Sequence, residues 1–140
     1  MKKSKITFLL VAIIILTTLS VALTFYLRNV KPGENDGEIV VLTIINYGSL
    51  KPINNSEEYN VTVQQGSSAL SAFSLVADLD LTNYSFGSYV KGVNGYSEEL
   101  PNYWAFYHYN LQTDEWQYSP YGISNYYLDV NSKIKLQYTG

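Results

Sequence analysis

A long uncharged segment near the N-terminus constrains the chain more than any other feature. No side chain from residue 6 to residue 27 carries a charge, and Lys2, Lys3 and Lys5 stand directly before this run. As a helix rising 1.5 Å per residue it would be about 33 Å long, enough to cross a hydrocarbon core of roughly 30 Å. We therefore expect residues 1–28, whose apolar run begins at Ile6 and ends at Leu27, to form a transmembrane signal anchor.

The positive charges around this segment predict its orientation. Three lysines precede it, and only Arg28 and Lys31 follow it before acidic residues appear. A bias of this kind favours a cytoplasmic N-terminus. We expect a single-pass protein of the cell membrane with its C-terminal domain outside.

Cleavage of the segment as a secretory signal is the alternative. Ser20 and Ala22 are small residues at the spacing of a signal peptidase site, and cleavage there would release a secreted protein. The apolar run continues past that site and is longer than the core of a usual signal sequence, which favours the retained anchor. A buried helix of a soluble protein is the third interpretation. The chain has no cysteine, so lipid attachment at cysteine, disulfides and thiolate metal sites are excluded.

The remainder of the chain has the size of one acidic domain. Residues 29–38 form a polar linker rich in turn formers, and residues 39–140 suffice for one hydrophobic core. From Glu34 onward the chain carries all twelve acidic residues and four lysines, a net charge of −8. This charge argues against nucleic acid as a partner. Three Asn-X-Ser/Thr sequons begin at Asn54, Asn60 and Asn83, and either glycosylation or chance explains them.

The residue patterns of this domain predict strands and one helix. The β-branched run 39–46 predicts a buried strand, alternation over 59–64 a half-buried strand, and Gln65-Gly66 a turn. Ser67 or Ser68 then caps a short helix with Leu70, Phe73 and Val76 or Ala77 on one face. Further along we expect a loop at 78–83, a turn at 94–95 and paired strands at 103–109 and 116–118. Residues 122–128 are expected to be irregular or to form a short turn of helix, and 133–138 to form the last strand. The predicted class is α+β, one helix packed on a mixed sheet.

Several segments in this order resemble a known family. They are residues 61–70, the hairpin at 87–95, the aromatic strand at 103–107, and residues 122–128 followed by 133–139. Together the chain resembles an exported domain family of unknown function, similar to the C-terminal domain of transcobalamin and intrinsic factor. The resemblance implies a β-grasp-like fold. In those two proteins the domain covers one face of a corrin ring, and a larger helical domain covers the other. The sequence departs from the family pattern at 108–112 and at 129–132, where its turns differ.

Aromatic side chains are the main candidates for a binding surface. Strand alternation places Trp104 and Phe106 on one face, which we expect to be core, and Tyr107 and Tyr109 on the other. The returning strand brings four candidate ligand-binding residues together: Tyr107, Tyr109, Trp116 and Tyr118. Tyrosine and tryptophan are amphipathic and stiff, and they stack on sugar or corrin rings. Ordinary packing of a sheet face is the alternative.

No constellation in the sequence predicts catalysis. His108 is the single histidine and has no cysteine or fixed carboxylate to complete a metal site. The paired acidic residues lie beside turns, and we find no phosphate-binding loop and no nucleophile elbow. We expect no enzyme activity, no catalytic or metal site and no cofactor.

The expected function is that of a membrane-anchored, extracytoplasmic binding domain for a corrinoid or another ring-shaped small molecule such as a glycan. The alternative is a structural or adhesive cell-surface module that binds another protein. A concave aromatic groove would favour the small ligand, and a flat exposed aromatic patch the protein partner.

Overall fold

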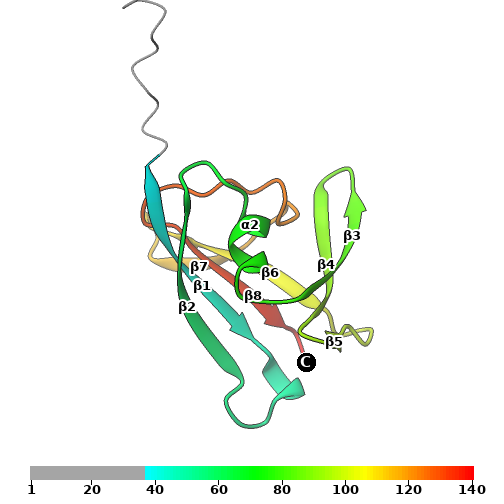
Figure 1. The fold of residues 1–140 in the computed structure, drawn as a ribbon. Coiled ribbons are helices and arrows are strands. Elements are labelled where there is room, and N and C mark those ends of the chain that lie inside the picture. Colours follow the sequence, from blue (N-terminus) through cyan, green and yellow to red (C-terminus); the bar gives the residue numbers. More distant parts are fainter. Residues whose placement is uncertain (1–36) are drawn as a thin grey trace, which may run out of the picture. The chain divides into compact units, whose positions relative to one another are not determined.

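The computed structural model describes residues 37–140 (Figure 1). The expected signal anchor, residues 1–28, and all of the linker except Gly37 and Glu38 lie outside the described residues. Within residues 37–140 no helix has the length and apolar character needed to cross a membrane.

A five-stranded mixed sheet forms the main layer. Its strand order is β2-β1-β8-β6-β7, and the strands are β1 (Glu38–Asn46), β2 (Ser56–Gln64), β6 (Trp104–Asn110), β7 (Glu115–Tyr118) and β8 (Lys133–Tyr138). The first and last strands, β1 and β8, lie side by side and parallel at the centre, while the other pairs are antiparallel. The predicted α+β class and the predicted pairing of β6 with β7 are confirmed. A 3₁₀ turn, η1 (Gly48–Leu50), follows β1.

A second sheet was not expected from the sequence. It consists of β3 (Leu79–Tyr84), β4 (Gly87–Val93) and β5 (Tyr96–Ser97), with β4 in the middle. The predicted loop at 78–83 is therefore wrong. Leu79 and Leu81 pack against the core, while polar residues alternate with them, so a strand forms wherever β4 supplies a partner. The predicted turn is confirmed, with positive φ angles of 50° at Asn94 and 84° at Gly95.

The single helix, α2 (Ala69–Ser74), lies on one face of the five-stranded sheet (Figure 1). Ser68 caps it, since its side chain accepts a hydrogen bond from the backbone N–H of Ser71. The predicted cap and the burial of Phe73 are confirmed. The helix buries Ala69 and Ala72 beside Phe73, whereas Leu70 is only partly buried. The small alanine side chains allow the helix to approach the sheet closely.

Strand β1 is buried on one face and not on both, which corrects the prediction for residues 39–46. Ile39, Val41 and Ile45 are buried in the core, whereas Val40 is 59% exposed. The helix and the second sheet contact the same face of the five-stranded sheet, through β1, β2 and β6. The β-branched residues on the outer face of β1 therefore favour a strand by their conformational propensity, and only the residues on its inner face are buried.

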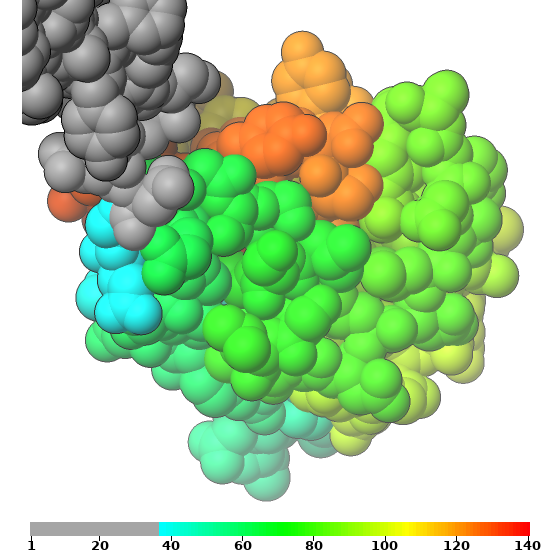
Figure 2. Space-filling model, turned by 45° about the horizontal axis from the view of Figure 1, so that its top comes forward, coloured from blue at the N-terminus to red at the C-terminus, as the bar shows by residue number. Residues whose placement is uncertain are grey.

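The segment between β7 and β8 joins the two sheets. Figure 2 shows its residues 119–130, in orange, between the helical segment and the β3–β4 hairpin. Backbone hydrogen bonds run from Ala69 N–H to Tyr126 O (2.8 Å) and from Ile123 N–H to Ser88 O (3.0 Å). The irregular conformation predicted for 122–128 is confirmed, and this segment positions the candidate site.

Candidate functional site

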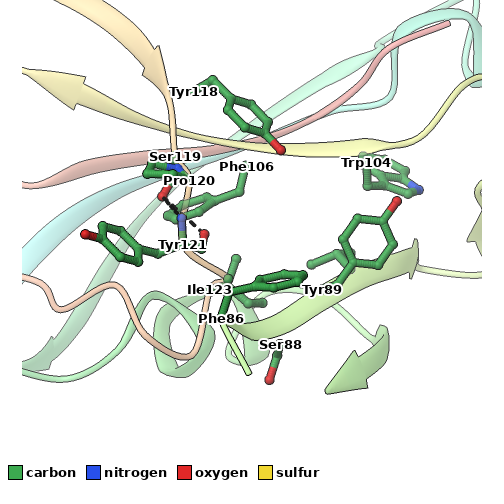
Figure 3. Close-up of a pocket in the computed structure, with 12 residues that line it drawn as sticks. Phe86, Ser88, Tyr89, Trp104, Phe106, Tyr118, Ser119, Pro120, Tyr121 and Ile123 are labelled. Carbon is green, nitrogen blue, oxygen red and sulfur yellow. Dashed lines mark hydrogen bonds between the residues drawn. The ribbon is translucent and has the colours of Figure 1, made fainter. Parts of the chain in front are cut away.

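A groove lies between the two sheets and is lined mainly by aromatic and aliphatic side chains (Figure 3). It contains about 370 Å³ of space, part of which is open solvent. We call this site the groove, and it is lined by Phe86, Ser88, Tyr89, Val90, Trp104, Phe106, Tyr118, Ser119, Pro120, Tyr121, Gly122 and Ile123.

The inner face of β6 supplies the floor of the groove. Trp104 is only 2% exposed, and its indole N–H donates a hydrogen bond to Tyr96 O at 2.9 Å, which fixes the ring. Phe106 packs edge-on against Phe73 of α2 and Tyr126, with centroid distances of 6.1 and 5.4 Å. The expectation that Trp104 and Phe106 belong to the core is confirmed. The same two side chains also border the groove, so its floor is rigid.

Residues 119–123 close one side of the groove by bridging the sheets. Ser119 N–H donates to Phe106 O at 2.9 Å, and Gly122 N–H donates to Phe86 O at 2.9 Å. A Cβ atom at Gly122 would lie 2.6–2.7 Å from backbone atoms of Gly87 and Ser88, closer than real Cβ contacts. Only glycine therefore lets this segment approach β4 so closely.

The rim of the groove consists of exposed aromatic side chains. Phe86, Tyr118 and Tyr121 line it and are each exposed. Tyr84 stacks on Phe86 with centroids 5.1 Å apart, which extends the aromatic surface along the hairpin. Figure 3 shows the Tyr118 hydroxyl directed toward the space above Trp104. Exposed aromatic rings around a concave apolar floor are typical of ligand sites.

The groove offers an uncharged environment. Tyrosine is the only titratable type among its lining residues. Burial, together with the hydrogen bond that the Tyr89 hydroxyl donates to the Glu98 carboxylate, raises the pKa of Tyr89 above its usual value, so the phenol stays neutral. The Ser119 hydroxyl bonds to the backbone of Tyr121 within its own turn. The arrangement suits an apolar, uncharged ring with a few polar substituents.

The four predicted residues do come together on one sheet face. Tyr107 lies opposite Tyr118 and Tyr109 opposite Trp116, with ring centroids 5.8 and 5.3 Å apart in edge-to-face geometry. We call this set of Tyr107, Tyr109, Trp116 and Tyr118 the platform. It lies on the face opposite Trp104 and Phe106, as alternation predicts, and Tyr118 also reaches the rim of the groove. Ligand binding by these residues stays a prediction.

Two lysines of β8 partly cover the platform. The Lys133 ammonium lies 4.4 Å from the Tyr109 ring centroid, and the Lys135 ammonium lies 5.0 Å from Tyr107 and 4.8 Å from Trp116. Cation–π contacts of this kind occupy the ring faces. A neutral flat ligand would have to displace the lysines from the platform, whereas in the groove no such displacement is needed.

Sequence reasoning missed most of the groove. Phe86, Tyr89 and Tyr121 were not proposed as site residues, although Tyr84, Phe86 and Tyr89 form an aromatic series along one hairpin. That series was a usable signal. No local pattern indicates that these aromatic residues lie near β6, because that proximity depends on the second sheet and on the backbone hydrogen bonds around Gly122.

His108 lies on the inner face of β6, away from the platform. Its ring stacks on Tyr126 at 5.1 Å, its Nδ1 is buried without a hydrogen-bond partner in the described structure, and burial lowers its pKa. Among residues 37–140 no three His, Cys, Asp or Glu side chains gather in a way that would hold a metal ion.

Comparisons with known proteins identify the fold. No family model matches the chain, and no curated protein matches it. The structure is similar to that of haptocorrin in complex with Cbi, a member of the transcobalamin family, with a TM-score of 0.59 and 18% sequence identity. The alignment covers 74% of this chain and 25% of the haptocorrin chain, so the chain spans about a quarter of that protein's length. The fold is therefore distantly similar to one part of a transcobalamin-type protein, in agreement with the resemblance found in the sequence.

Proposed function

We propose that this protein is a membrane-anchored, extracytoplasmic binding domain that holds a ring-shaped small molecule in the groove. The observation that carries the proposal is the groove itself, a concave surface with a rigid aromatic floor, exposed aromatic rim and no charged lining residue. Small-molecule sites are usually concave and mainly apolar, with few polar groups that set orientation.

Corrinoids and glycans are the candidate ligands. The likeness to haptocorrin, solved in complex with Cbi, supports a corrinoid. The enclosed part of the groove is small, so only an edge or a substituent of a larger ring system would enter it. We infer that a corrinoid would insert an edge or substituent into the groove, while a second protein would cover its remaining surface.

We expect Tyr121→Ala to weaken ligand binding about tenfold or more, because loss of a contacting aromatic ring costs roughly 1.4 kcal/mol or more. Titration calorimetry of the full-length chain with cobinamide and with a panel of neutral oligosaccharides measures the affinity. Trp104 borders the groove, so its fluorescence reports occupancy independently. The matched control is Tyr127→Ala, because Tyr121 and Tyr127 belong to the same segment and are 59% and 68% exposed, but Tyr127 does not line the groove.

Equal affinities for Tyr121→Ala and Tyr127→Ala would refute the groove as the binding site. If no corrinoid or neutral glycan binds the wild-type chain, the small-ligand function fails, and the alternative of a module that binds another protein is favoured. Thermal melting of both variants is included, since an exposed ring contributes little to stability and both should stay folded.

The membrane anchor and its orientation are tested separately. With tags at both ends of the chain, protease added to intact cells is expected to remove the C-terminal tag and to spare the N-terminal tag, because three lysines precede the apolar run. A C-terminal tag that resists the protease would show that the orientation is the reverse of the predicted one. Loss of the N-terminal tag from isolated membranes would instead establish signal cleavage and a secreted protein.

A further inference from the structure

The platform combines aromatic rings with two positive charges, which the groove does not. Lys133 and Lys135 are neighbours on the outer face of β8, and their register places Lys135 directly beside Tyr107 of β6. Their ammonium groups lie 4.4–5.0 Å from the ring centroids of Tyr109, Tyr107 and Trp116. Half of the four lysines that follow residue 34 are thus concentrated on one patch of an otherwise acidic domain.

Neither lysine forms an ion pair with a carboxylate of residues 37–140. The ion pair found among residues 37–140 joins Lys51 to Glu57, outside the platform. Two acidic residues, Asp114 and Glu115, directly precede Trp116 in the chain, and the Asp114 carboxylate accepts a hydrogen bond from the Tyr109 hydroxyl. Glu58 lies on β2, which is separated from β8 by β1. Burial lowers the pKa of Lys135.

The platform therefore provides two recognition elements, rings for the face of a cyclic ligand and ammonium groups for an anionic substituent. A carboxylate placed between the lysines would supply the missing counter-charge and draw the Lys135 ammonium away from the Trp116 ring. A sugar ring could then pack on Trp116 and Tyr118, the members nearest the sheet edge. We propose that the platform is a second binding site, which shares only Tyr118 with the groove, for an acidic glycan whose uronic acid carboxylate pairs with Lys133 and Lys135.

The dimensions of the platform favour a glycan over a protein surface. Together with Lys133 and Lys135 it spans three adjacent strands, β8, β6 and β7, which is about 10 Å at the usual spacing between strands. That width matches one or two sugar rings, whereas a stable protein interface covers about 800 Å² on each partner.

The decisive comparison is between oligogalacturonate and its methyl ester, since the ester keeps the sugar rings and removes the charge. We expect the full-length chain to bind the acid at least about tenfold more tightly than the ester. The affinity for the acid should fall as salt concentration rises, because exposed charge pairs are screened. Lys135→Gln should weaken binding of the acid about tenfold, while the control Lys91→Gln, an exposed lysine of β4 outside the platform, should leave it unchanged.

Three results would overturn this proposal. They are equal binding of acid and ester, unchanged affinity in a folded Lys135→Gln variant, and an equal loss in Lys91→Gln, which would indicate a nonspecific charge effect. A polyglutamate peptide is tested as a further ligand. If it binds as tightly as oligogalacturonate, the platform recognises acidic protein segments instead of an acidic glycan. Tyr121→Ala should not alter binding of the acid, so failure at the groove and failure at the platform are distinguishable.

Discussion

Replacing Trp104 by alanine is expected to lower the free energy of unfolding by about 3–5 kcal/mol, the usual cost of deleting a large buried aromatic side chain. Trp104 is almost completely buried, and its ring packs edge-on against Tyr47 and Tyr138 at 5.6 Å from each. The substitution would also remove the indole N–H that satisfies Tyr96 O. Denaturant unfolding monitored by circular dichroism measures the change.

Trp116→Ala is the matched control, because it deletes the same side chain from the half-buried outer face. We expect a loss of about 1 kcal/mol or less, since its contacts are one edge-to-face pair with Tyr109 and the Lys135 ammonium. If both variants lose the same stability, Trp104 does not have the special place in the core that the structure gives it.

Gly122→Ala is expected to cost about 1–3 kcal/mol or more, and to abolish ligand binding in the groove. The added methyl group would lie 2.6–2.7 Å from backbone atoms of Gly87 and Ser88, and backbone cannot move aside as a flexible side chain can. Relief of the clash would separate residues 119–123 from β4 and break the hydrogen bond from Gly122 N–H to Phe86 O. Thermal melting and cobinamide titration of the same variant measure both consequences.

Gly92→Ala serves as the control for an added methyl group. Its Cβ would meet Asp80 Cβ and Tyr96 O at 3.3 Å, a tight contact that shifts of a few tenths of an ångström relieve. We expect a smaller loss of stability and an intact groove. Wild-type stability and binding in Gly122→Ala would show that residues 119–123 do not have to contact β4 for the groove to form.

Local sequence patterns predicted the parts of the molecule that depend on short turns, on helix capping or on the alternation of side chains along a strand. Ile134, Leu136 and Tyr138 alternate with polar residues, and all three are buried as expected. The Asn94-Gly95 turn follows from the tolerance of both residues for positive φ. The platform belongs to this class as well, because a short hairpin fixes which residues of β6 and β7 lie opposite one another.

Contacts between distant segments could not be predicted in this way. Leu79 to Tyr84 is too polar to indicate a strand by itself, and it becomes one because β4 provides hydrogen-bond partners and the core covers Leu79 and Leu81. The exposure of the outer face of β1 could not be predicted either, since an apolar β-branched run has the same sequence pattern whether one face or both faces are buried.

The sequence by itself therefore determined the strands of the five-stranded sheet, the helix cap, the acidic character of the domain and the residues of the platform, because these depend on composition, alternation and short turns. The tertiary structure alone decided the groove. Its floor comes from β6, its opposite wall from β4, and its closed side from residues 119–123, which the missing side chain of Gly122 allows against β4. Those segments meet only because two sheets pack together, and packing between sheets leaves no periodic signal in a single chain.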